Sequence, residues 1–216
     1  MDGYLSRLLE RAPHLYAWEK EYRAKGKLWR GVGDSFDFAL LPRGCKVLEL
    51  GCGDGKTLSS LVSRGFKVTG IDISPSAVEL AKEKVGKKAK LIVGDVCDLP
   101  FAANSFDAVV AVHVLDHLSE KERKVAVSEI QRVLKKGGVL FFEGFSKQDF
   151  RFAKGIEIER NTFRRGNNVW YHYFSLVEAK RLFSKFKLVE AKEKVDARSV
   201  AGLKVNRAVV QFIGRK

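Results

Sequence analysis

The sequence is poor in cysteine and has no long apolar run. Its three cysteines, Cys45, Cys52 and Cys97, are odd in number and lack CxxC spacing, which argues against a disulfide framework and a zinc site. No apolar stretch approaches the roughly 18 residues that cross a bilayer, and the first residues lack the apolar core of a signal peptide. We therefore expect a cytoplasmic protein with no membrane segment and no bound metal.

Acidic side chains are scarce relative to basic ones, and the formal net charge is +14. The excess is concentrated in residues 146–216, which contain 17 basic and 7 acidic side chains and so carry +10. A positive field of this size attracts polyanions such as nucleic acid. The alternative is a lysine-rich surface that only keeps the protein in solution.

A chain of 216 residues that is 45% hydrophobic is long enough for one compact α/β domain. From Lys46 onward, short apolar runs alternate with helical patterns, which predicts a parallel sheet wrapped by helices. We divide this single domain into a helical extension (1–44), a core (45–145) and a basic segment that includes the closing strands (146–216). The predicted strands are 47–50, 67–71, 90–93, 108–112, 139–142, 187–194 and 204–213.

Capping signals set the ends of the predicted helices, which are 56–63, 75–85, 119–134 and 175–185. Ser74 before Pro75 is a good N-cap pair, whereas Ser119 with Glu122 and Ser175 with Glu178 match the capping box. Gly137-Gly138 is expected to stop the third helix.

A glycine turn follows the first predicted strand, in the segment Val47 to Thr57. Glycines are needed where the backbone turns sharply or lies close to a ligand. They fall at the first, third and fifth places (Gly51, Gly53, Gly55), whereas a dinucleotide fingerprint places them first, third and sixth. The segment is not a P-loop either, because the glycine five residues upstream of Gly55-Lys56-Thr57 is missing.

Acidic residues end the next two strands. Asp72 lies 21 residues after Gly51, where a carboxylate can accept hydrogen bonds from both hydroxyls of a ribose, and Asp95 ends the third strand within reach of an adenine amino group. Each aspartate alone would be interpreted as a turn or cap residue. Together with the glycine turn they predict a nucleoside site at the carboxyl ends of the strands.

Four segments resemble successive motifs of class I S-adenosylmethionine-dependent methyltransferases, especially the branch that includes ubiquinone/menaquinone methyltransferases. They are VLELGCGDGKTL, GIDISPSAVELAKEK, GDVCDLPFAANSFDAVVAVHVLDHL and EIQRVLKKGGVLFFEG. The resemblance covers about residues 45–145 and is specific for the cofactor, not for the substrate. It implies a Rossmann-like, doubly wound α/β fold with seven mostly parallel strands in the order 3-2-1-4-5-7-6 and helices on both faces.

The same resemblance implies how S-adenosylmethionine, and its product S-adenosylhomocysteine, would be held. Glu49, Gly51 and Gly53 would frame the amino-acid end, Asp72 and Ile73 the ribose, and Asp95 and Val96 the adenine. His113 would lie beside the transferred methyl group. An aromatic lid would be formed by Trp18, Tyr22 and Trp29, for which core packing is an equally good interpretation.

The candidate catalytic residues follow the fourth strand and are His113, Asp116 and His117. On a helix, spacings of three and four would place them on one face. Methyl transfer from a sulfonium mainly requires alignment and desolvation, so a base is needed only if the acceptor must lose a proton. The alternative is that these residues only shape the pocket. The Asp/Asn-Pro-Pro-aromatic motif of many amino-group methyltransferases is absent, and either Asp116 or a backbone carbonyl near His113 could accept from such an amine instead.

Residues 146–174 interleave basic and aromatic side chains. Arginines can neutralise phosphates while aromatic rings stack on unpaired bases, a combination suited to single-stranded or looped RNA. Aromatic residues at strand spacing are more often core. The predicted substrate-binding residues are Arg160, Arg164, Arg165, Trp170 and Tyr171.

The sequence thus predicts a methyltransferase that acts on RNA, with a base amino group in ribosomal or transfer RNA as the most specific hypothesis. One alternative is a small-molecule methyltransferase in which residues 146–174 form a lid over the pocket. A second is a non-catalytic RNA-binding assembly factor that retains the fold.

Overall fold

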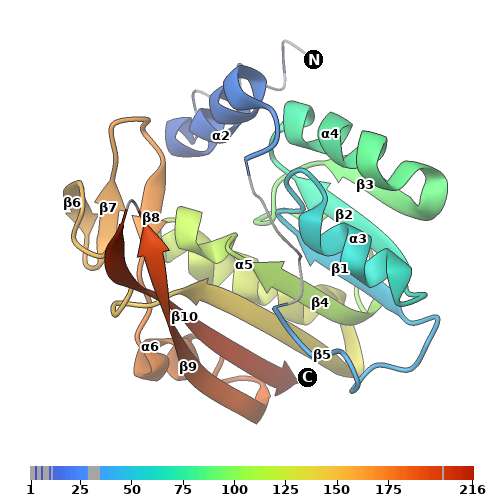
Figure 1. Cartoon of the computed structure of the whole chain (residues 1–216). Coiled ribbons are helices and arrows are strands. Elements are labelled where there is room, and N and C mark those ends of the chain that lie inside the picture. Colours follow the sequence, from blue (N-terminus) through green and yellow to red (C-terminus); the bar gives the residue numbers. More distant parts are fainter. Residues whose placement is uncertain (1–2, 4–5, 7–9, 11, 29–34, 201) are drawn as a thin grey trace.

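The computed structural model describes residues 3, 6, 10, 12–28, 35–200 and 202–216. Its main feature is a seven-stranded sheet in the order β3-β2-β1-β4-β5-β10-β9 (Figure 1). The bounds are β1 (Lys46–Leu50), β2 (Lys67–Asp72), β3 (Ala89–Val93), β4 (Phe106–Val112), β5 (Leu134–Phe145), β9 (Lys187–Val200) and β10 (Leu203–Arg215).

The first five strands of this sheet are parallel, and β10 runs antiparallel to both β5 and β9. The labels skip β6 to β8 because those strands form a separate sheet. Counted along the chain within the large sheet, the order is 3-2-1-4-5-7-6, so the predicted fold class is confirmed.

Helices cover both faces of the large sheet. Leu48 and Leu50 of β1 pack in one buried cluster with α5 (Glu120–Val133) and α6 (Leu176–Leu182), whereas Val47 packs in a second cluster with α3 (Lys56–Ser63). This alternation follows from the twofold repeat of a strand. A third helix, α4 (Pro75–Val85), packs against β3 and β2 and ends in the 3-10 turn η1 (Gly86–Lys88).

Two predicted helix starts are confirmed. The Ser74 side chain accepts from the amide of Ala77 at the start of α4, and Ser119 and Glu122 form both bonds of a capping box at the start of α5. At α6 only half of the predicted box forms. Ser175 accepts from the Glu178 amide, but the Glu178 carboxylate accepts instead from His172 Nε2 at 2.9 Å.

Several boundaries differ from the prediction. Helix α2 spans Pro13–Lys25, and residues 35–45 form turns and irregular chain, so the helical structure expected for the extension (1–44) is wrong for residues 35–44. Helix α5 ends at Val133, because Leu134 already pairs with Phe106, and Gly137-Gly138 therefore lies inside β5 instead of ending a helix. Helix α6 stops at Leu182, since Phe183 and Phe186 turn into the core beside Phe212.

Residues 156–172 contain a small antiparallel sheet that the sequence did not predict. It consists of β6 (Ile156–Glu159), β7 (Thr162–Arg164) and β8 (Trp170–His172). Its strand β8 lies against η2 (Leu115–His117), the 3-10 turn after β4, and so brings the small sheet to the carboxyl end of the large one. Phe145, Phe163 and Tyr173 form a buried cluster at this junction.

Candidate active site

A pocket lies at the carboxyl ends of β1, β2, β4 and β5, below α2. Carboxylates, glycines, imidazoles and aromatic rings line it together. Of the predicted cofactor residues, the pocket is lined by Trp18, Tyr22, Glu49, Gly51, Gly53, Asp72, Ile73, Asp95, Val96 and His113. Trp29 lies outside the residues that the structure describes.

The glycine loop lies in close contact with the elements around it. Gly51 and Gly53 have φ values of +63° and +53°, which a side chain rarely tolerates. A Cβ at Gly53 would lie 2.5 Å from the hydroxyl oxygen of Tyr22, and one at Gly51 would lie 2.7 Å from Val114 Cγ2. The loop therefore needs glycine at both places, for backbone conformation and for space.

Asp72 joins the glycine loop to the end of β2. Its Oδ2 accepts from the Gly53 amide at 2.8 Å, and its Oδ1 accepts from the Ser74 amide at 2.9 Å. Burial raises the pKa of Asp72 to about 6, although these two amide bonds favour the charged form. The Ile73 amide also contributes a hydrogen bond to this carboxylate. Because each carboxylate oxygen has two acceptor sites, Asp72 can still accept a further hydrogen bond from a ligand.

Two more carboxylates in the pocket have an oxygen without a partner. Glu49 Oε2 and Asp54 Oδ1 are buried and have no hydrogen-bond partner among the described residues. Burial, and then the charge of Asp72, raises the pKa of Glu49 well above its usual value. Buried oxygens of this kind are costly unless a donor reaches them, and a ligand with a cationic or hydroxyl donor would satisfy them. The sequence analysis missed Asp54, although it follows Gly53 directly.

Helix α2 covers the pocket and is attached to the start of α4 by one buried carboxylate. Glu19 accepts from Ser74 Oγ at 2.7 Å, from Ser76 Oγ at 2.7 Å and from the Ser76 amide at 3.1 Å. Trp18 and Tyr22 of the same helix face the pocket. The lid position that we expected for these two rings fits their place in the fold. No sequence signal identified Glu19.

His113 lies between two carboxylates at the end of β4. Its Nδ1 is 2.8 Å from Asp116 Oδ2, its Nε2 is 3.5 Å from Glu143 Oε1, and its ring stacks on Phe145 with centroids 4.1 Å apart. The backbone of His113 has a φ of +51°, so it precedes η2 and is not part of a helix. The shared helical face that we predicted for residues 113, 116 and 117 is therefore not formed, although His113 and Asp116 do meet.

Asp116 does not face the pocket, which corrects our expectation that it could accept from an amine of the substrate. The side chain is fully buried, and besides contacting His113 it accepts from the Phe145 amide at 3.2 Å. It can act on a substrate only through His113. Glu143, which the sequence analysis missed, lines the pocket instead and accepts from Ser35 Oγ and Gln211 Nε2. Its position at the carboxyl end of β5 could have identified it.

His117 lines the pocket as a neutral ring. Burial lowers the pKa of His117 to about 4, and its Nδ1 donates to the Trp170 carbonyl at 2.7 Å. The ring meets Trp18 and Tyr171 edge-on, at centroid distances of 4.5 and 5.2 Å. His117 thus ties β8 to the pocket wall and adds no charge there at neutral pH.

The five predicted substrate-binding residues do not share one surface. Trp170 stacks on His14 at 4.0 Å, and the Arg165 guanidinium lies 4.1 Å from the centre of the Tyr171 ring and donates to the Tyr173 hydroxyl at 2.6 Å. The first contact joins β8 to helix α2, and the other two fix Arg165 against β8 and the residue that follows it. Arg164 is exposed on β7, and Arg160 lines a separate groove.

The described residues contain no group of three or more His, Cys, Asp or Glu side chains arranged to hold a metal ion. None of their helices combines the length and the apolar character that crossing a membrane requires.

The chain is similar in sequence and in fold to known methyltransferases. Residues 48–142 match a family model described as a methyltransferase domain. A crystal structure of a SAM-dependent methyltransferase from Methanosarcina mazei is 28% identical and has a TM-score of 0.67, covering 82% of this chain and 94% of that one.

Two curated relatives are named as tRNA methyltransferases. A tRNA N(3)-methylcytidine methyltransferase of Drosophila melanogaster is 30% identical over 195 residues, which cover 82% of this chain and 59% of that protein. A tRNA (carboxymethyluridine(34)-5-O)-methyltransferase of Xenopus tropicalis is 31% identical over 140 residues, which cover 64% and 21%. The chain therefore spans less than two thirds of the length of either relative.

Proposed function

We propose, from the premise that this chain belongs to the class I S-adenosylmethionine-dependent methyltransferases, that it methylates a pyrimidine nucleotide of transfer RNA. The observation that carries the cofactor half of this proposal is the set of buried acceptors in the pocket. The substrate half rests on the two relatives and on the charge of the chain.

The pocket residues fit the cofactor. The unpartnered oxygens of Glu49 and Asp54 would receive the ammonium group of its amino-acid end, and Asp72 would accept from the ribose hydroxyls through its remaining lone pairs. Asp95 and Val96 line the part of the pocket at the end of β3, where adenine would lie. When bound, S-adenosylmethionine supplies an electrophilic methyl group on a sulfonium.

The acceptor would enter between the rings at the ends of β4 and β5. Glu143 and Asp116 orient His113, while neutral His117 and Trp18 provide an uncharged surface beside it. Aromatic and imidazole faces suit a flat base, and the enclosed site excludes water from an in-line displacement. We assign these residues the role of aligning the acceptor base, and we place His113 nearest to the reacting atoms.

The choice of transfer RNA rests on the names of the relatives and on charge. One relative acts on cytidine at N3 and the other on a modified uridine at an oxygen, so both names give a pyrimidine nucleotide of tRNA. Neither name gives an exocyclic amino group, which was our sequence-based hypothesis. The charge of +10 on residues 146–216 favours a polyanionic substrate.

A small-molecule acceptor is the second candidate, and one observation favours it. Strand β8 and helix α2 are joined beside the pocket by the Trp170–His14 stack, and the His117 bond to the Trp170 carbonyl fixes the adjacent pocket wall. A pre-formed wall of this kind suits a small ligand. A non-catalytic RNA-binding role is the third, and it requires that no methyl group is transferred at all.

One labelling experiment separates the three. The purified protein is incubated with methyl-labelled S-adenosylmethionine and either unmodified tRNA, ribosomal RNA or a pool of small metabolites, with the Asp72→Ala variant as a control for contaminating activity. We expect label only in tRNA, and nucleoside mass spectrometry should place it on a pyrimidine. Label confined to metabolites would establish the second candidate, and RNA binding without any transfer would establish the third.

A further inference from the structure

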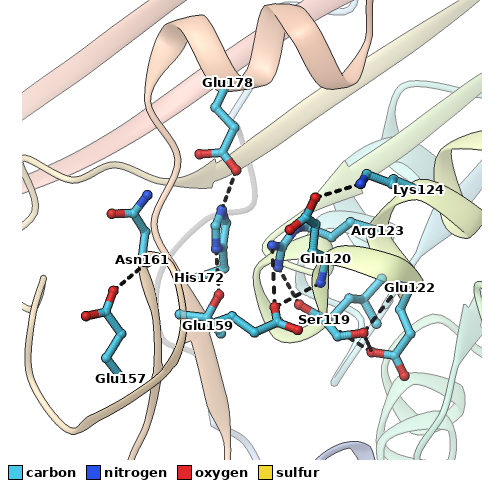
Figure 2. A network of polar contacts seen from close by, with 12 residues as sticks. Ser119, Glu120, Glu122, Arg123, Lys124, Glu157, Glu159, Asn161, His172 and Glu178 are labelled. Atoms are coloured by element: carbon cyan, nitrogen blue, oxygen red, sulfur yellow. Dashed lines mark hydrogen bonds and ion pairs between the residues drawn. The ribbon is translucent and has the colours of Figure 1, made fainter.

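A second concave site lies outside the pocket, between the first turn of α5, helix α6 and the connection from β6 to β7 (Figure 2). We call it the basic groove, and its volume is about 770 Å³. Five cationic side chains line it, together with the carboxylates of Glu120 and Glu178. The cationic residues are Arg123, Lys124, Lys147, Arg160 and Arg181.

The carboxylates of the basic groove are already paired. Glu120 is 2.6 Å from Lys124 Nζ, and Glu178 accepts from His172. In contrast, neither Arg160 nor Arg181 has a hydrogen bond or an ion pair within the described part of the chain, and both side chains are exposed. Two cations thus face the groove without a direct ion pair, although the charge of Glu120 acts on Arg181. The five cations of the groove outnumber its two carboxylates, and this surplus favours an anionic ligand.

The floor of the groove is held by a continuous polar network. The buried Arg123 donates to the Leu118 carbonyl at 2.5 Å and lies 3.8 Å from Glu159, which in turn accepts from the Glu120 amide at 2.9 Å. Beside it, His172 contacts Thr162 Oγ1 at 2.8 Å and Glu178 at 2.9 Å. Figure 2 shows His172 pointing toward Glu178, and Glu159 reaching the start of α5. The groove is therefore a built surface between elements far apart in sequence.

One strand separates the basic groove from the pocket. On β8, Tyr171 meets the pocket residue His117 edge-on, whereas the next residue, His172, lines the groove. Consecutive strand residues point to opposite sides, so β8 lies between the pocket residue His117 and the groove. A nucleotide chain that places one base in the pocket would carry its neighbouring phosphates past β8 toward the groove.

We infer that the basic groove binds the phosphodiester backbone of the RNA next to the methylated nucleotide, with Arg160 and Arg181 as the main phosphate contacts; this inference rests on the proposed function. The two arginines come from different elements, the β6–β7 turn and α6, which suits successive phosphates along a strand better than one small anion. The groove replaces the cluster of Arg160, Arg164 and Arg165 as the phosphate-binding surface.

The test is a titration of unmodified tRNA into the full chain at several salt concentrations. Each phosphate contact on a single strand contributes about −0.7 to the slope of log affinity against log salt. The double variant Arg160→Ala/Arg181→Ala should therefore flatten this slope by about 1.4 and weaken tRNA binding. Arg160→Lys/Arg181→Lys should keep most of the slope, because it keeps both charges.

The matched control is Lys87→Ala/Lys88→Ala, which removes the same charge from exposed side chains in η1, before β3. It should leave the slope unchanged, and all variants should bind S-adenosylhomocysteine like the wild type in calorimetry. If the wild type methylates tRNA but both alanine variants superimpose on it, the inference is wrong and the proposed function stands. If the wild type neither binds nor methylates tRNA, both are wrong.

Discussion

The two walls of the pocket differ in chemistry and in how they are built. The wall at β1 and β2 presents the carboxylates Glu49, Asp54 and Asp72, whereas the wall at β4 and β5 presents the rings of His113 and His117. The first wall offers acceptors to a ligand rich in hydroxyl and ammonium donors. The second offers flat faces to an acceptor that must be aligned. Under the proposed function, the first wall would hold the cofactor and the second would align the base.

The walls also differ in the range of contacts that hold them. The carboxylate wall is local, since Asp72 bonds to the loop that follows the neighbouring strand. The ring wall depends on residues distant in the sequence, because His117 is fixed by the Trp170 carbonyl and Glu143 by Gln211. Because the proposed function assigns the cofactor to the carboxylate wall and the acceptor to the ring wall, substitutions on the first should alter cofactor affinity and substitutions on the second should alter turnover.

The largest effect is expected on the ring wall. His113→Ala should lower kcat on the identified RNA about 100-fold, because loss of alignment near the reacting atoms can cost that much. S-adenosylhomocysteine affinity should change far less, as calorimetry would show. Asp116→Asn keeps one acceptor for the Phe145 amide and should lower kcat less than His113→Ala does. If affinity falls as much as kcat in both variants, the division between the walls is wrong.

The next effect is on the carboxylate wall. Asp72→Ala should weaken S-adenosylhomocysteine binding by about 1 to 3 kcal/mol, roughly 5- to 160-fold and about 30-fold at the middle of that range, because it leaves buried donors without an acceptor. The Gly53 and Ser74 amides lose their partner in the same variant. Calorimetry measures the affinity, and a thermal melt separates it from unfolding. An affinity equal to that of the wild type would remove Asp72 from the cofactor site.

The smallest effect is a pH dependence that only the carboxylate wall should show. Burial raises the pKa of Asp72 to about 6, and donors on the ligand favour its charged form, so binding should release a proton below pH 6. S-adenosylhomocysteine affinity should fall about tenfold from pH 7 to pH 5 and level off above pH 7. Asp72→Asn should remove the part of this dependence that comes from Asp72, and Glu49, whose pKa is also raised by burial, should supply what remains. A profile that is flat in the wild type would contradict the assignment.

The sequence allowed the carboxylate wall to be predicted because its parts lie close together in the chain. Gly51, Gly53 and Asp72 follow strands at fixed spacing, and the strand order then places them side by side. The ring wall could only be predicted in part. His113 follows β4, but no local sequence pattern predicts that Glu143 contacts it or that Arg165 donates to the Tyr173 hydroxyl.

The same reason explains the errors outside the pocket. Arg160, Arg164 and Arg165 are close in sequence, yet they have three different surroundings. Arg160 lies in the turn before β7, Arg164 is the last residue of β7, and Arg165 begins the connection to β8. The groove that contains Arg160 also needs Arg123 and Arg181, which come from helices far along the chain. Charge counts locate an excess of positive side chains, whereas only the packing of β6 to β8 decides where each one faces.

Ser74 links two parts of the molecule that the pocket requires together. Its amide donates to Asp72, its hydroxyl donates to Glu19 of α2, and the same oxygen accepts from the Ala77 amide. Ser74 thus connects the carboxylate assigned to the ribose with the helix that covers the pocket. Coupling of this kind is reciprocal. If packing of α2 against α4 raises the affinity for a nucleoside by some factor, binding of the nucleoside favours that packing by the same factor. The coupling between closure of α2 and nucleoside affinity is then one free energy, which can be measured through either process.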